Sequence, residues 1–170
     1  EFDLFRAAHP VIAAVEASSS AGKYDGVRYG HRSEGAKNWN DMYLDSRGEA
    51  FGTRVKSFLF QGAYFQFENY GAFENACRIR GFLVRKMAGL FQDFDVLVSP
   101  TCAPAEKEAV PAGVGGVYDD FLLTLPANLT GHPALQVPDP AAERKDLGLQ
   151  FIARRLDDAR LLALGAELNS

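Results

Sequence analysis

Cysteine is scarce in this sequence. Its two cysteines, Cys77 and Cys102, form no Cys-x-x-Cys pair. Structural zinc sites and disulfide frameworks both need clustered cysteines, so the sequence predicts neither. The histidines, His9, His31 and His132, lie too far apart for a ligand spacing such as HxxxH, and we expect no metal site. Two free thiols are typical of a reducing compartment, so we expect a cytoplasmic protein.

The sequence also lacks an excess of positive charge. Lys and Arg number 18 against 22 Asp and Glu, a formal net charge of −4. A dedicated nucleic-acid surface usually shows a basic excess, so we expect no DNA partner. No apolar run approaches the length of a membrane span, and no Gly-rich loop with a Lys suggests a bound nucleotide. The sequence therefore predicts no membrane association and no cofactor.

The composition is ordinary for a globular protein. Hydrophobic residues make up 47% and charged residues 24% of the 170 residues, with no internal repeat. A chain of this length can bury a core, and we expect residues 1–170 to form a single piece.

Helical patterns alternate with short apolar runs. Helices are expected at these places: His9 to Ala17, provided that Pro10 lies in the first turn; a segment capped by Asn38 or Asn40 and ended by Gly52; a segment capped by Thr53; Tyr70 to Phe91; Tyr118 to Leu129; and a last one opened by Asp157 and Asp158. Strands are expected at Phe94 to Val98, which should be buried, and in a hairpin of Ala134 to Val137 with Leu147 to Ala153. This alternation predicts an α/β fold with a mixed sheet flanked by helices.

The most informative stretch is VEASSSAGKYDGVRYG, from Val15 to Gly30. Three serines and Gly22 should break the apolar run before it. Asp25-Gly26 is a turn dipeptide, because Asp bonds its own backbone and Gly accepts a positive φ. An Arg then stands between two tyrosines, so we expect an ordered surface turn.

Five pieces, in one order along the chain, resemble the amidase signature family, and within it the branch of the glutamyl-tRNA(Gln) amidotransferase A-subunits. They are EASS with YDGVRYG, Asp41-Met42-Tyr43 with Arg47 to Gly52, Phe94 to Thr101, Leu125 to Leu135, and Leu147 to Ile152. The resemblance covers only the C-terminal part of a full-length member. It implies the C-terminal portion of a large mixed sheet flanked by helices, with apolar surface that the N-terminal part normally covers.

The resemblance also implies where the chemistry lies. Members of the family cleave amides with a Ser nucleophile, a second Ser and a Lys, and all three precede the part represented here. We therefore expect no catalytic residue in this chain and no activity of the chain alone. A missing N-terminal half or partner amidotransferase subunits would supply the chemistry, and tRNA would be met only through the complete complex. Ser18 to Ser20 with Lys23 is the local alternative, but short hydroxyl runs are usually caps and turns.

The candidate substrate-binding residues are Tyr24, Asp25, Arg28 and Asp120. In the amidotransferase branch, an Arg and an Asp meet the two charges of free glutamine. A VKRR-like stretch supplies that Arg, but here it reads Val55 to Phe58 without one. At the position of that Asp stands Phe121, with Asp120 adjacent; the usual Tyr-Tyr pair is His9-Pro10.

These departures leave three alternatives open. One is an amidase of a less polar amide, completed by the missing N-terminal half. Another is a stand-alone, non-catalytic binding or scaffold module. The third is an RNA-binding module that uses the basic side of the long helix: Arg78, Arg80, Arg85 and Lys86. For that helix side, a solvated face is the simpler interpretation.

Overall fold

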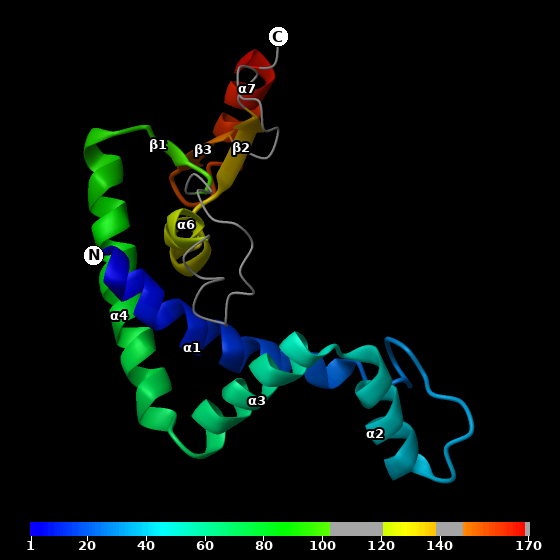
Figure 1. Ribbon diagram of the computed structural model, residues 1–170. Coiled ribbons are helices and arrows are strands. Elements are labelled where there is room, and N and C mark those ends of the chain that lie inside the picture. The colour runs from blue at the N-terminus through cyan, green and yellow to red at the C-terminus, as the bar shows by residue number, and fades with distance from the viewer. Residues whose placement is uncertain (103–120, 139–147, 169–170) are drawn as a thin grey trace, which may run out of the picture. The chain divides into compact units, whose positions relative to one another are not determined.

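The computed structural model describes residues 1–102, 121–138 and 148–168 (Figure 1). The elements, in chain order, are α1 (Phe2–Ser20), the 3-10 helix η1 (Ala21–Lys23), α2 (Trp39–Ala50), α3 (Thr53–Phe67), α4 (Tyr70–Asp93), β1 (Val96–Pro100), the 3-10 helix η2 (Leu122–Thr124), α6 (Leu125–Thr130), β2 (Ala134–Pro138), β3 (Gly148–Ala153) and α7 (Asp158–Leu168). They fall into two compact units, one of Glu1–His9 with Arg78–Ser170 and one of Pro10–Cys77.

The first helix differs from the sequence prediction. Helix α1 begins at Phe2, so Pro10 lies in its interior, and the helix runs through the serines that should have broken it. An interior proline removes one backbone hydrogen bond and costs about 3 kcal/mol. The helix tolerates this because its apolar stripe continues across the proline, through the buried residues Phe5, Ala8, Ile12 and Val15. Burial at helical spacing therefore outweighs the local signal.

In the Pro10–Cys77 unit, α1 and α3 approach each other closely at Gly62. This glycine is buried, and a Cβ built on it would lie 2.6 Å from the carbonyl carbon of Ala14 and from Ser18 Cβ. One turn further along, Gln66 Nε2 donates to the Val15 carbonyl at 3.0 Å. The contact therefore requires glycine at this position.

The start of α2 confirms one of the two predicted caps. Asn38 is extended, with φ −154°, and its side chain accepts from the Asp41 amide at 3.0 Å. An Asn at this position satisfies one of the free amides of the first turn. Helix α3 begins at Thr53 as expected, but its cap is Gly52.

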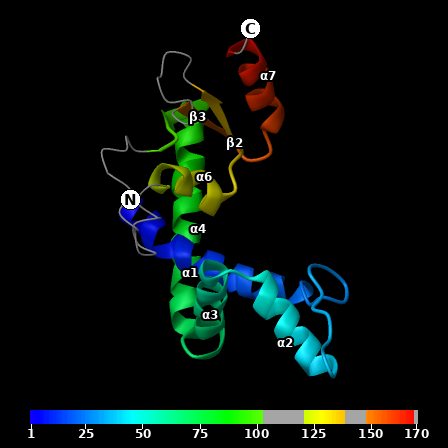
Figure 2. The same cartoon turned by 45° about the vertical axis from the view of Figure 1, so that its right-hand side comes forward.

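In the other unit, β1, β3 and β2 form an antiparallel sheet in that order. Leu97 pairs with Ile152 on one side, and Ala134 pairs with Ile152 on the other. Helix α7 packs against β2 and β3 (Figures 1 and 2). The hairpin of β2 and β3 and the helix opened by Asp158 were both predicted from the sequence.

Two expectations in this unit are wrong in detail. The strand predicted at Phe94 to Val98 is shifted to Val96–Pro100, and Val98 is 54% exposed, so it is not a buried strand. Residues 118–120 of the helix predicted at Tyr118 to Leu129 lie outside the described part, and among the described residues α6 begins at Leu125, after the 3-10 helix η2. Pro126 lies in the first turn of α6. A proline fits there because backbone N–H groups in the first turn have no hydrogen-bond partner within the helix.

Helix α4 has the bounds that its periodicity predicts, within two residues. Leu83 is fully buried, and Met87 and Phe91 follow it on the same side of the helix. On another side, Arg80 Nε donates to the Leu129 carbonyl at 2.9 Å and Lys86 pairs with Glu1 at 3.2 Å. Arg80 and Lys86, which were considered for RNA binding, thus already have protein partners.

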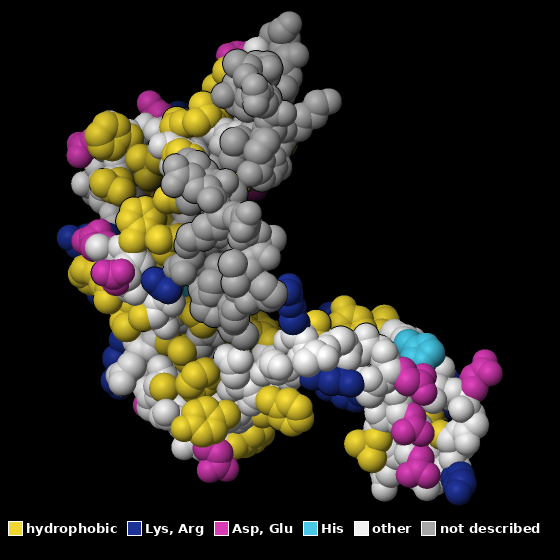
Figure 3. Space-filling model, viewed as in Figure 1, with side chains coloured by type: hydrophobic (Ala, Val, Ile, Leu, Met, Phe, Trp, Pro, Cys, Tyr) yellow, Lys and Arg dark blue, Asp and Glu magenta, His cyan; other side chains and the backbone are white. Residues whose placement is uncertain are grey.

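Large apolar side chains remain on the surface, and Figure 3 shows hydrophobic groups spread over the face in view. On α3, Phe60 is 76% exposed and Phe67 80% exposed. This matches the expectation of apolar surface left uncovered. No helix among the described residues is long and apolar enough to cross a membrane.

Candidate functional site

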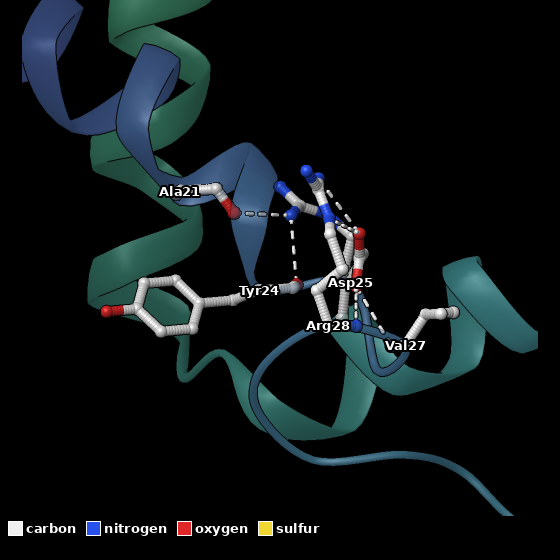
Figure 4. Close-up of polar contacts among 6 residues, drawn as sticks. Ala21, Tyr24, Asp25, Val27 and Arg28 are labelled. Atoms are coloured by element: carbon white, nitrogen blue, oxygen red, sulfur yellow. Dashed lines mark hydrogen bonds and ion pairs between the residues drawn. The ribbon is translucent and has the colours of Figure 1, made fainter.

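The turn after α1 is held by one carboxylate. Asp25 Oδ1 accepts from the amides of Val27 and Arg28, at 2.9 and 3.0 Å, and Oδ2 accepts from Arg28 Nε at 3.1 Å (Figure 4). Gly26 has φ +77°, which glycine adopts without strain. The turn predicted from Asp25-Gly26 is therefore confirmed, and a single side chain orders three of its groups.

Helix α2 also fixes this turn. Arg47 Nη1 donates to the carbonyls of Ala21 and Tyr24, at 2.8 and 3.2 Å (Figure 4). A Cβ on Gly26 would lie 2.7 Å from Ser46 Oγ, so the turn backbone rests directly on α2. The buried Ser46 hydroxyl also accepts from the Ser33 amide at 2.9 Å. Side chains of α2 thus position both ends of the loop.

A second carboxylate holds the following residues. Glu49 accepts from Ser33 Oγ at 2.8 Å and bonds His31 Nε2 through its other oxygen. The hydrogen bonds from His31 and Ser33 lower the pKa of the Glu49 carboxyl. Because Glu49 lies between the hydroxyl and the imidazole, these three residues do not form a Ser-His-acid relay.

Three of the four predicted substrate-binding residues come together in this turn. Asp25 is buried, at 8% exposure, whereas Tyr24 is 44% exposed and the Arg28 side chain 65% exposed. Arg28 Nε and Nη2 both lie 3.1 Å from Asp25 Oδ2, so the carboxylate serves the turn, while the Tyr24 and Arg28 side chains stay partly open to solvent. Asp120 lies outside the described residues. Contact of these residues with a substrate stays a prediction.

The loop that follows the turn borders a hollow of about 640 Å³. Arg32, Glu34 and Lys37 line it with Trp39 and Met42 of α2. Charged groups of both signs beside an indole ring can receive a polar group next to an apolar one.

Asp25 should keep this turn ordered in acid. Hydrogen bonds from the amides of Arg28 and Val27 lower its pKa from 3.8 to about 2. Because the pKa is lowered in the folded state, the stabilisation is complete above pH 3.8 and is lost as the pH falls through about 2. We expect the amide chemical shifts of Val27 and Arg28 to titrate with that low midpoint in NMR spectra, and Asp25→Asn to abolish the titration. A midpoint near the ordinary value would show that the turn does not hold the carboxylate.

The other sequence candidates lie in ordinary helical surroundings. Ser57, in the stretch where the family resemblance implies an Arg, is exposed, and its hydroxyl donates to the Thr53 carbonyl at 2.9 Å. Among the serines at the end of α1, Ser20 donates to the Ala17 carbonyl at 3.3 Å. Lys23 Nζ lies 5.2 Å from the centroid of the Tyr24 ring. These contacts are those of helix ends, as the simpler interpretation of the serine run predicts.

One polar cluster was missed by sequence reasoning. His132 is buried, stacks on Phe91 with ring centroids 5.1 Å apart, and bonds Thr130 Oγ1 through Nδ1 at 2.7 Å. A lone histidine is more often a surface or hydrogen-bonded core residue than a metal ligand, and His132 is a hydrogen-bonded core residue. A His that follows Thr130-Gly131 at the end of a helix was the available signal, but only packing brings Phe91 beside it.

The family model described as Amidase matches residues 2–162. The chain belongs to the amidase family. The expectation drawn from its motifs is thus confirmed at the family level.

The curated relatives of this amidase-family chain include A-subunits of glutamyl-tRNA(Gln) amidotransferases. The chain is 37% identical over 165 residues to the glutamyl-tRNA(Gln) amidotransferase A-subunit of Pediococcus pentosaceus, covering 94% of this chain and 34% of the relative. The same protein of Granulibacter bethesdensis is 36% identical over 168 residues, covering 95% and 34%. The chain therefore spans about a third of the length of these relatives.

The fold agrees with this family. A solved amidase structure superposes with a TM-score of 0.66 at 23% identity, covering 95% of this chain and 34% of that one. At this identity the likeness concerns the fold alone. It confirms that the small sheet and its helices form a portion of the amidase fold.

Proposed function

We propose that this chain forms the substrate-contacting part of an amide-hydrolysing protein like the glutamyl-tRNA(Gln) amidotransferase A-subunit. The observation that carries the proposal is 37% identity to that protein over 94% of the chain. Amide hydrolysis there would supply ammonia for amidating Glu-tRNA(Gln). Partner amidotransferase subunits would use the ammonia, and tRNA would be met only through the complete complex.

In this proposal the Ser-Ser-Lys residues implied by the family resemblance lie outside this chain. Amide cleavage needs a hydroxyl nucleophile with a base in hydrogen-bond reach and donors aimed at the developing oxyanion. The described contacts of Ser20 and Lys23 are to a helix carbonyl and a tyrosine ring, not to each other. The chain would instead contribute the turn of Tyr24, Asp25 and Arg28, whose backbone is fixed before any substrate arrives.

A specific observation favours a second candidate substrate, an amide less polar than glutamine. Free glutamine carries a carboxylate and an ammonium, and each needs an opposite charge when it is buried. Ser57 and Phe58 occupy the stretch in which the resemblance implies an arginine. Without that guanidinium, selectivity for glutamine would fall, because the substrate carboxylate would lose a bidentate partner.

Ammonia release by the full gene product, from glutamine and from benzamide, tests both candidates. The amidotransferase function predicts a higher kcat/KM for glutamine, and the second candidate predicts a higher one for benzamide. Release from neither amide would contradict the proposal. This comparison needs no variant.

Arg28→Gln tests the role of the turn in the same assay. Loss of one charge-assisted hydrogen bond to substrate should lower kcat/KM about tenfold or more, mainly through KM. The matched control is Arg54→Gln, since Arg54 lies exposed in the first turn of α3. Equal kcat/KM values for the two variants would remove the turn from the substrate site.

A further inference from the structure

The cluster around His132 borders a hollow of about 520 Å³. Its lining combines the imidazole and two guanidinium groups with an amide and apolar groups: Ala88, Phe91, Gln92, His132, Arg154 and Arg155. All six residues belong to one unit. None of them is used in the proposed amide hydrolysis, so the site has to be explained separately.

The hydrogen bonds of Thr130 fix the tautomer of His132. The Thr130 hydroxyl has one hydrogen, which it donates to the Pro126 carbonyl, so it can only accept from its other neighbour. That neighbour is His132 Nδ1 at 2.7 Å, which therefore carries a proton. Burial and then the charge of Arg155 lower the pKa of His132, so the ring is neutral at pH 7. The lone pair is consequently on Nε2.

His132 is 7% exposed, and its Nε2 has no hydrogen-bond partner among the described residues. A ring nitrogen with a free lone pair can accept a hydrogen bond from a donor that reaches it. Because His132 lines the hollow, this acceptor is available to a ligand that carries an O–H or N–H donor.

The charge beside this acceptor is positive. Arg154 is paired with Asp95 at 3.3 Å, but no carboxylate among the described residues pairs with Arg155. Arg155 Nε lies 3.7 Å from where a Cβ of residue 131 would be, so its guanidinium lies next to His132 in the space that Gly131 leaves. A planar guanidinium binds a carboxylate with two hydrogen bonds.

We propose that this hollow binds a small 2-hydroxycarboxylate with an apolar body. Arg155 would hold the carboxylate, His132 Nε2 would accept from the hydroxyl, and the apolar body would lie against Ala88 and Phe91. An amino acid fits less well, because its ammonium would face two guanidinium groups at short range. The ligand must therefore carry an uncharged hydrogen-bond donor on the atom next to its carboxylate.

Mandelate is the probe for this site, with three analogues that each remove one feature. Phenylacetate lacks the hydroxyl, mandelamide lacks the charge, and phenylglycine replaces the hydroxyl with an ammonium. The measurement is the ring signal of His132 in NMR spectra of the full chain with labelled histidines, assigned by its loss in His132→Gln. His9 and His31 serve as internal references.

We expect mandelate to shift the His132 signal and each analogue to bind at least about tenfold more weakly. Phenylacetate and mandelamide each lose a hydrogen bond, and the ammonium of phenylglycine faces the two guanidinium groups. Arg155→Gln should weaken mandelate by a similar factor without affecting mandelamide. Arg155 is exposed, so this variant should fold. The control is Arg160→Gln, because Arg160 pairs with Asp95 and Asp157 and does not line the hollow.

Three results would overturn the proposal. One is an unchanged His132 signal at saturating mandelate concentrations. Another is equal binding of mandelate and phenylacetate, which would exclude the Nε2 acceptor. The third is equal weakening by Arg155→Gln and Arg160→Gln, which would leave only a general effect of positive charge.

Discussion

Gly62→Ala is expected to lower the free energy of unfolding by about 3 kcal/mol, at the upper end of the range for overpacking. The added methyl group would lie 2.6 Å from the carbonyl carbon of Ala14, a backbone atom that cannot rotate away. Relief requires α1 and α3 to separate, which would also strain the bond from Gln66 to the Val15 carbonyl. Guanidinium denaturation followed by circular dichroism measures the loss.

Gly48→Ala is the matched control for this substitution. Gly48 lies inside α2, and a Cβ there would meet nothing within 4 Å. Alanine is the better helix former, so this variant should gain about 0.5–1 kcal/mol. The same chemical change thus has opposite effects at two helical glycines. A loss of less than about 1 kcal/mol for Gly62→Ala would show that the helices part easily.

Leu83→Ala is expected to cost about 3–5 kcal/mol in the free energy of unfolding. Leu83 is fully buried in α4, so the substitution removes apolar contacts and leaves a cavity. The control on the same helix is Leu90→Ala, because Leu90 is 44% exposed and should lose clearly less. Both values come from denaturation curves under one set of conditions. Equal losses for the two variants would contradict the packing of α4 described above.

The sequence predicted the elements whose local signals agree with their packing. Residues close together in the chain were enough to predict three elements: the apolar spacing of α4, the Asn38 cap and the Asp25-Gly26 turn. The prediction for α1 was wrong at Pro10. A proline is typical of the first turn of a helix, but the buried apolar stripe of α1 continues on both sides of Pro10. The error arose where tertiary burial outweighed a local preference.

The candidate site was predicted less completely. Tyr24, Asp25 and Arg28 could be grouped because they are neighbours in the chain, and the structure shows that Asp25 is committed to the turn. The loop is held by three residues of α2: Ser46, Arg47 and Glu49. Their spacing in the sequence does not predict these contacts. The cluster of His132 with Phe91 depends on residues 41 positions apart, 132 minus 91. Contacts of this kind follow from tertiary packing and produce no periodic pattern in the sequence.

The central claim is that this chain contributes to amide hydrolysis but does not catalyse it alone. The most direct test measures ammonia release by the purified 170-residue chain. Glutamine, asparagine and a small aromatic amide would be the substrates. We expect no turnover above the uncatalysed rate with any of them. Robust turnover that Ser19→Ala or Lys23→Ala abolishes would contradict this, and would make the serine run at the end of α1 an active site.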